Sequence, residues 1–123
     1  MSSKTQLGFV SLQVSDLDAS RRFYAEVLGF TLAAQSPPDA CVFETQGGAV
    51  FALRTALVDL AAVSRLGWGV SLWFGVPDLE IYRAQLDGRA HVVRDVQVTP
   101  FGKILVVADP DGYWLTIQET GAR

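Results

Sequence analysis

Val14-Ser15-Asp16-Leu17 recurs 62 residues later as Val76-Pro77-Asp78-Leu79, in a chain of 123 residues. Each tetrad ends a stretch of alternating apolar and polar residues, which is typical of a strand, and opens a stretch with helical spacing. One unit of strand, helix and further strands is therefore written twice along the chain. Such a duplication predicts a pseudo-twofold cavity at which equivalent positions of the two halves face one another. The side chains at those positions should decide the function.

The first half of the chain has the order β-α-β-β-β. Residues 7–14 alternate as a half-buried strand does. Asp16 or Ser15 can cap the helix that follows, and Gly29 ends it. Short strands are then predicted at residues 30–34, 41–45 and 49–55.

The second half repeats this order. A strand is predicted at residues 70–76 and a helix from Asp78 to residue 86, followed by strands near residues 92–98, 103–108 and 113–118. The sequence Asp109-Pro110-Asp111-Gly112 is a strong turn signal between the last two strands, because proline fixes φ and glycine accepts a positive φ.

Between the halves, the apolar residues of 56–66 recur at the spacing of a short amphipathic helix. This segment is either a linker packed on the core or a lid over the cavity. We expect a single domain over residues 1–123, with the first module at about residues 6–55, a linker at 56–67 and the second module at about 68–119.

The composition favours a folded protein that binds neither nucleic acid nor membranes. Half of the residues are apolar and 19% are charged, with a net charge of −3, which is unlike a disordered chain. The ten Lys and Arg residues are scattered rather than clustered, which argues against nucleic-acid binding. No stretch approaches the roughly 18 apolar residues of a membrane span. Residues 1–4 lack the apolar run of a secretory signal, so we expect a cytoplasmic location.

The chain has one cysteine, Cys41, and one histidine, His91. A single thiol cannot form an internal disulfide, and Cys41 is interpreted as a small buried hydrophobe. Sites for zinc, iron, nickel or manganese need several imidazole, thiolate or carboxylate groups that converge on one point. No His-x-His or Cys-x-x-Cys spacing occurs, and no Ser-His-Asp or Cys-His arrangement is suggested.

Several stretches occur in a specific order: residues 12–20 (LQVSDLDAS), 23–24 (FY), 28–30 (LGF), 99–103 (TPFGK) and 109–112 (DPDG). Together they resemble the vicinal oxygen chelate superfamily, which includes glyoxalase I, extradiol dioxygenases, fosfomycin resistance enzymes and bleomycin resistance proteins. The resemblance covers nearly the whole chain. It implies an α+β fold in which two βαβββ modules form an open, curled mixed β-sheet barrel with the helices outside and a ligand cavity within.

The metal-dependent members of that superfamily hold a divalent ion with four side chains from four strands, usually His and Glu or Gln. The resemblance places these positions seven residues before each junction aspartate, five residues after the aspartate of the final Asp-Gly turn, and at the equivalent site of the first module. They are occupied here by Phe9, Ser71, Thr116 and Ala52, and His91 lies outside them. None of the four is a competent metal ligand, so the resemblance implies a metal-free member without a cofactor or catalytic residues.

Side chains alternate between the two faces of a strand. The four positions therefore also mark which alternate side chains of each strand, here called the cavity-facing register, are predicted to face the cavity. This register mixes aromatic, small and hydrogen-bonding side chains, as concave sites for small organic molecules do. The opposite register is almost uniformly apolar and is predicted to form the core. Phe9, Trp73 and Trp114 can stack on a planar ligand. The predicted ligand-binding residues are Phe9, Ser11, Gln13, Ala52, Arg54, Ser71, Trp73, Trp114, Thr116 and Gln118.

Among the side chains predicted to face the cavity, Arg54 is the one that carries a formal charge. Because a buried charge without a partner is costly, Arg54 either pairs with a carboxylate, reaches solvent or meets an anionic group of the ligand.

These features predict metal-independent binding or sequestration of a small, flat, largely apolar organic molecule. The chain looks most like the bleomycin resistance proteins, which capture a drug rather than alter it. Bleomycin itself is not implied, because a strongly cationic drug would favour acidic groups on the inner face. A homodimer is expected, as the family usually forms one. Two alternatives stay open: a glyoxalase-like lyase, isomerase or dioxygenase with a divergent active site, and a structural or regulatory module with a closed cavity.

Overall fold

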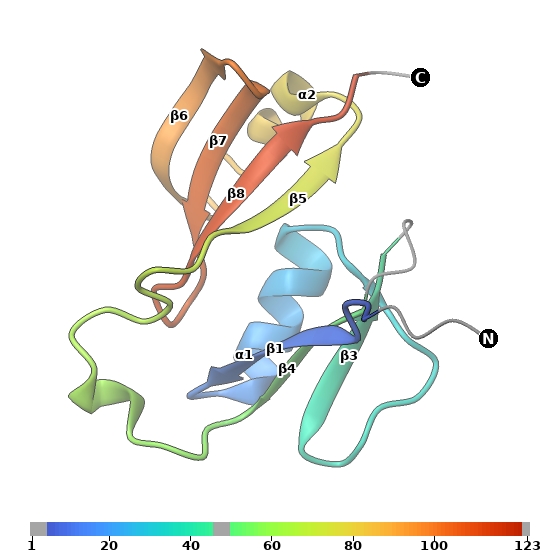
Figure 1. Ribbon diagram of the computed structural model, residues 1–123, viewed down its shortest axis with the longest axis vertical. Coiled ribbons are helices and arrows are strands. Elements are labelled where there is room, and N and C mark those ends of the chain that lie inside the picture. The colour runs from blue at the N-terminus through green and yellow to red at the C-terminus, as the bar shows by residue number, and fades with distance from the viewer. Residues whose placement is uncertain (1–4, 46–49, 122–123) are drawn as a thin grey trace. The chain divides into compact units, whose positions relative to one another are not determined.

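A computed structural model describes residues 5–45 and 50–121 (Figure 1). The chain divides into two compact units, Met1–Leu60 and Ala61–Arg123, with a boundary inside the linker predicted at residues 56–67. Each unit has the predicted order of strand, helix and three strands, and each contains one open, mixed four-stranded sheet. The α+β class and the two βαβββ modules are thereby confirmed. That the two sheets enclose one common barrel stays a prediction.

The first unit is built on the sheet β1-β4-β3-β2, in which β1 and β4 are parallel and the other pairs are antiparallel. Asp16 caps the helix as predicted, since its Oδ1 accepts a hydrogen bond from the backbone N–H of Ala19 at 3.0 Å. Gly29, at a φ of +83°, follows the last helical turn. The elements are β1 (Phe9–Val14), α1 (Leu17–Arg22), the π-helical turn η1 (Phe23–Val27), β2 (Thr31–Leu32), β3 (Ala40–Glu44) and β4 (Val50–Thr55).

The core of the first unit is an aromatic cluster centred on Tyr24, whose side chain is fully buried. Its ring lies 5.5 Å from those of Phe30 and Phe51, measured between centroids, and 6.0 Å from that of Phe43. Because Tyr24 belongs to η1 while Phe43 and Phe51 belong to the sheet, these contacts hold the helix on one face of the sheet. Cys41 is buried on the same sheet, as predicted, and this burial raises the pKa of its thiol.

The second unit has the equivalent sheet order β5-β8-β7-β6, again with one parallel pair, β5 and β8. Asp78 caps the helix through a 3.0 Å hydrogen bond from the N–H of Ile81. The predicted turn is formed by buried Asp109, whose Oδ1 accepts hydrogen bonds from the N–H groups of Asp111 and Tyr113, both at 2.9 Å. The elements are β5 (Leu72–Val76), α2 (Leu79–Gln85), β6 (His91–Thr99), β7 (Gly102–Ala108) and β8 (Trp114–Glu119).

Two expectations about the connection between the units were wrong. The amphipathic helix predicted at residues 56–66 is a single 3-10 turn, η2 (Leu60–Ala62), and its flanking side chains Leu57 and Val63 are exposed. So short a helix is not stable unless its apolar face is buried, and here a large part of that face is exposed. The strand predicted to begin at residue 70 begins at Leu72, so that Ser71 precedes β5 instead of belonging to it.

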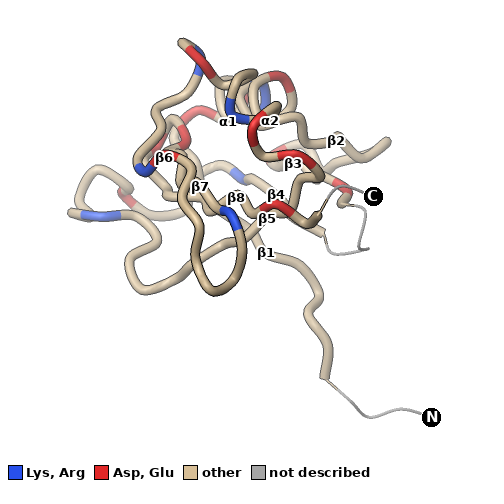
Figure 2. Tube along the Cα trace, turned by 90° about the horizontal axis from the view of Figure 1, so that it is seen from above, with Lys and Arg blue, Asp and Glu red and all other residues tan. Residues whose placement is uncertain are grey.

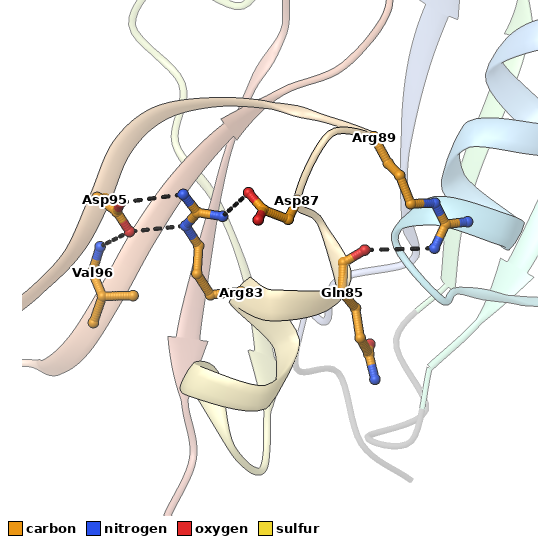
Figure 3. Close-up of polar contacts among 6 residues, drawn as sticks. All are labelled: Arg83, Gln85, Asp87, Arg89, Asp95 and Val96. Atoms are coloured by element: carbon orange, nitrogen blue, oxygen red, sulfur yellow. Dashed lines mark hydrogen bonds and ion pairs between the residues drawn. The ribbon is translucent and has the colours of Figure 1, made fainter.

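Helix α2 is joined to strand β6 by Arg83 and Asp95 (Figure 3). The guanidinium donates from Nε to Oδ1 at 2.9 Å and from Nη2 to Oδ2 at 3.3 Å. These bonds from Arg83, together with one from the N–H of Val96, lower the pKa of the Asp95 carboxyl below its ordinary value. The pair is a two-point contact between helix and strand.

Replacing Asp95 with asparagine should therefore destabilise the protein in a pH-dependent way. A carboxyl whose pKa is lowered by folding adds stability above its unfolded pKa, and this contribution is lost as the pH falls through the folded value. We expect the melting temperature of D95N to lie below that of the unmodified protein near neutral pH, with the gap narrowing as the pH falls below about 4, the ordinary pKa of an aspartate. Differential scanning calorimetry across this pH range measures the gap. A gap that stays constant would contradict the assignment.

Candidate functional site

In the first unit, the predicted ligand-binding residues lie on one face of the sheet. Residues opposite each other on paired strands share a face, and the register of β1 and β4 places Ser11 opposite Ala52 and Gln13 opposite Arg54. Phe9 lies on the same face of β1 as Ser11 and Gln13, because alternate side chains of a strand share a face, and it is 61% exposed. The other face carries the buried aromatic core.

The polar ends of Gln13 and Arg54 are already engaged within the first unit. Gln13 Oε1 accepts a 2.7 Å hydrogen bond from the N–H of Leu57, which fixes the chain just after β4. Arg54 Nη2 lies 3.5 Å from Asp39 Oδ2, and Arg54 Nε donates to the carbonyl of Thr55. Of the three possibilities for Arg54, the structure therefore shows two together: the guanidinium pairs with a carboxylate, and the side chain also reaches solvent, being 34% exposed.

The second unit gathers a richer set of side chains on one face of its sheet. Buried Leu105 and Leu115 lie on the opposite face, the side on which α2 is joined to β6. Figure 1 shows α2 beside this sheet. Three rows cross the remaining face, which we call the tryptophan face: Trp73, Thr116, Val106 and Arg94; Gly75, Gln118, Ile104 and Gln97; and Trp114, Ala108 and His91.

The tryptophan face combines buried aliphatic side chains with partly exposed aromatic side chains. Ile104 and Val106 are each 8% exposed, whereas Trp73 and Trp114 are 43% and 41% exposed. The ring of Phe101, in the turn before β7, lies edge-on to that of Trp73 at 6.1 Å between centroids. Gln118 Nε2 donates a 2.7 Å hydrogen bond to the Phe101 carbonyl and so holds this turn in place. The combination offers stacking surface together with hydroxyl and amide groups for orientation.

Sequence reasoning missed the β6 residues of this face, His91, Arg94 and Gln97. Strand β6 pairs irregularly with β7, with register shifts between Val92 and Arg94 and again between Arg94 and Gln97. Each irregularity breaks the simple alternation of side chains. Parity counted from the sequence therefore cannot assign the faces of this strand.

Sequence reasoning also missed Arg65, which lies in the connecting segment close to the tryptophan face. Its guanidinium carbon lies 3.8 Å from the ring centroid of Trp114 and 4.6 Å from that of Trp68. Both distances are those of cation–π contacts. An arginine between two strands carries no sequence pattern that would have predicted this contact.

The side chains at the superfamily's metal positions do not fit a catalytic metal. Ala52 lies opposite Ser11 and Thr116 lies opposite Trp73, so these two occupy equivalent places in the two sheets. With Phe9 and Ser71 they supply a methyl, a phenyl and two hydroxyl groups, none of which is a ligand that zinc, iron or nickel favours. Among residues 5–45 and 50–121, no three His, Cys, Asp or Glu side chains are placed to hold an ion.

Among residues 5–45 and 50–121, charges of both signs are spread along the chain. Figure 2 shows Lys and Arg interspersed with Asp and Glu from one element to the next. Among the described residues, no helix has the length and apolar character needed to span a bilayer.

The family sequence model of the Glyoxalase/Bleomycin resistance protein/Dioxygenase superfamily matches residues 6–117 of this chain. The chain therefore belongs to this superfamily. Among solved structures it is similar to TnmS3, an antibiotic binding protein from Streptomyces sp. CB03234, with 24% identity, 97% of this chain and 98% of that one covered, and a TM-score of 0.76. It is also similar to a glyoxylase/bleomycin resistance protein/dioxygenase domain from Frankia sp. EAN1pec, with 27% identity, coverage of 95% and 98%, and a TM-score of 0.70.

A protein of unknown function from Agrobacterium tumefaciens has the same fold, with 18% identity, 98% of this chain and 97% of that one covered, and a TM-score of 0.76. No curated protein sequence matches the chain.

Proposed function

We propose that this protein binds a small, flat, largely apolar organic molecule without a metal ion and sequesters it unchanged. The tryptophan face carries the proposal. Trp73 and Trp114 are 43% and 41% exposed, on the same face of the sheet as the buried side chains of Ile104 and Val106. Aromatic rings stacked in this way contribute on the order of 0.5–1.5 kcal/mol each beyond the burial of their area.

The polar groups on this face are suited to orienting a ligand. Thr116 lies opposite Trp73 on the neighbouring strand, so that its hydroxyl can form a hydrogen bond at the edge of a stacked ring. Capture of this kind needs affinity and abundance, and it needs no reactive group. The side chains at the metal positions, which suit no metal, are compatible with this function.

The similarity to TnmS3, which is described as an antibiotic binding protein, supports an antibiotic or a related natural product as the class of ligand. The family also supports a homodimer, which we propose as the solution state, since a twofold dimer is the commonest assembly of like chains. Of the residues predicted from the sequence, Trp73, Trp114, Thr116 and Gln118 form the proposed site.

The proposed function is tested by titrating the protein with planar aromatic molecules and following tryptophan fluorescence. A panel of anthraquinone, naphthalene and phenazine derivatives should include compounds that quench the emission saturably, with dissociation constants of about 10 μM or lower. N-Acetyltryptophanamide at equal absorbance corrects for quenching by collision. If no compound of the panel quenches saturably, the proposed function is wrong.

A further inference from the structure

Arg65 lies against Trp114, one of the aromatic residues of the tryptophan face. Its guanidinium lies over the indole rings of Trp114 and Trp68, at 3.8 and 4.6 Å from their centroids. A planar cation stacked on aromatic rings keeps a defined orientation, since sliding or tilting weakens the contact with both π-systems. A guanidinium stacked on a ring makes this contact through its flat face, so that its N–H groups, which lie in the plane, can still donate hydrogen bonds.

That N–H edge has no partner among the residues that the structure describes. Within residues 5–45 and 50–121, Arg65 forms neither a hydrogen bond nor an ion pair, whereas Arg54 pairs with Asp39 and Arg83 pairs with Asp95. A guanidinium presents five N–H donors in a rigid plane, and two parallel donors match the two oxygens of a carboxylate. Arg65 thus combines a fixed orientation with unused donors.

The charges of the tryptophan face point the same way. Its three rows contain Arg94 and His91 but no aspartate or glutamate. The carboxylates of the same strands are engaged on the other side of the sheet, where Asp95 bonds to Arg83 and Glu119 accepts from the N–H of Leu79. A ligand with a negative group on these three rows therefore meets the Arg94 guanidinium and no carboxylate of the same rows.

We propose that Arg65 determines specificity by binding the carboxylate of a flat aromatic ligand whose rings lie on the tryptophan face. This inference rests on the proposed function and narrows its ligand class to aromatic carboxylic acids. Trp114 then has two roles, since it holds the guanidinium and also borders the surface on which the ligand rings lie.

The test compares two probes of equal shape, anthraquinone-2-carboxylate and anthraquinone-2-carboxamide, by isothermal titration calorimetry at neutral pH. The unmodified protein should bind the carboxylate about tenfold more tightly or better, because a charged hydrogen bond is stronger than a neutral one. Arg65→Gln should abolish this preference while it leaves the carboxamide affinity within about threefold. Arg65→Lys, which keeps the charge without the planar fork, should retain only part of the preference.

Arg89→Gln is the matched control, because Arg89 is exposed in the turn after α2, where its guanidinium bonds to the backbone carbonyl of Gln85, the last residue of the helix (Figure 3). This variant should keep the full preference for the carboxylate. Equal binding of the two probes to the unmodified protein, or an unchanged preference in Arg65→Gln, overturns the role of Arg65 and leaves the proposed function standing. Failure of both probes to bind the unmodified protein overturns the inference, whereas the proposed function is decided separately by the wider panel of planar compounds.

Discussion

Replacing Trp73 with alanine is expected to lower the affinity for anthraquinone-2-carboxylate by about tenfold or more. Trp73 is 43% exposed, and its ring stands edge-on to Phe101 on the tryptophan face. Removing it deletes a stacking surface and the apolar area that a planar ligand would cover. Isothermal titration calorimetry measures the change, and circular dichroism checks that the variant is folded.

Ile81→Ala provides the control for this loss. Ile81 is also a large apolar residue and is 60% exposed, but it belongs to α2, which covers the other face of the sheet. Its substitution should change the affinity by no more than about twofold. If both variants bind like the unmodified protein, the ligand does not lie on the tryptophan face.

The largest effect on stability is expected for Tyr24→Ala, which should lower the free energy of unfolding by about 3–5 kcal/mol. Tyr24 is fully buried, and its ring contacts those of Phe30, Phe43 and Phe51. Truncation to alanine leaves a cavity in a cluster that holds η1 on the sheet, and the surrounding side chains relax only in part. Chemical denaturation followed by circular dichroism gives the difference.

Leu57→Ala is the corresponding control, because Leu57 is 67% exposed in the segment after β4. It should change the free energy of unfolding by no more than about 0.5 kcal/mol. A loss for Tyr24→Ala as small as that for Leu57→Ala would show that the aromatic cluster does not stabilise the first unit.

The repeated β-α-β-β-β order was predictable because its signals are local. Alternation of apolar and polar residues marks a strand with one buried face. An aspartate directly before a stretch with helical spacing marks the start of a helix, because its side chain can accept a hydrogen bond from the backbone N–H three residues later. Asp16 and Asp78 both form this cap. The same alternation assigned Trp73 and Thr116 to one face of the second sheet, as their pairing shows.

The connecting segment and strand β6 could not be predicted in this way. The apolar spacing of residues 56–66 indicates a helix only if a partner surface buries its apolar side, and the sequence does not say whether one exists. In β6, the register shifts on either side of Arg94 depend on how the strand pairs with β7. The contact between Arg65 and Trp114 joins the connecting segment to β8, and it follows from tertiary structure alone.

The central claim is that a flat molecule is captured without a metal and without chemical change. Its most direct test is to strip the protein with EDTA, titrate it with anthraquinone-2-carboxylate by calorimetry in the presence and absence of added Zn²⁺, Ni²⁺, Fe²⁺ or Mn²⁺, and recover the probe for mass spectrometry. We predict saturable binding near one molecule per chain, with an affinity that the metals leave unchanged and a probe of unaltered mass. Binding that appears only with a metal, or a probe whose mass has changed, would contradict the claim.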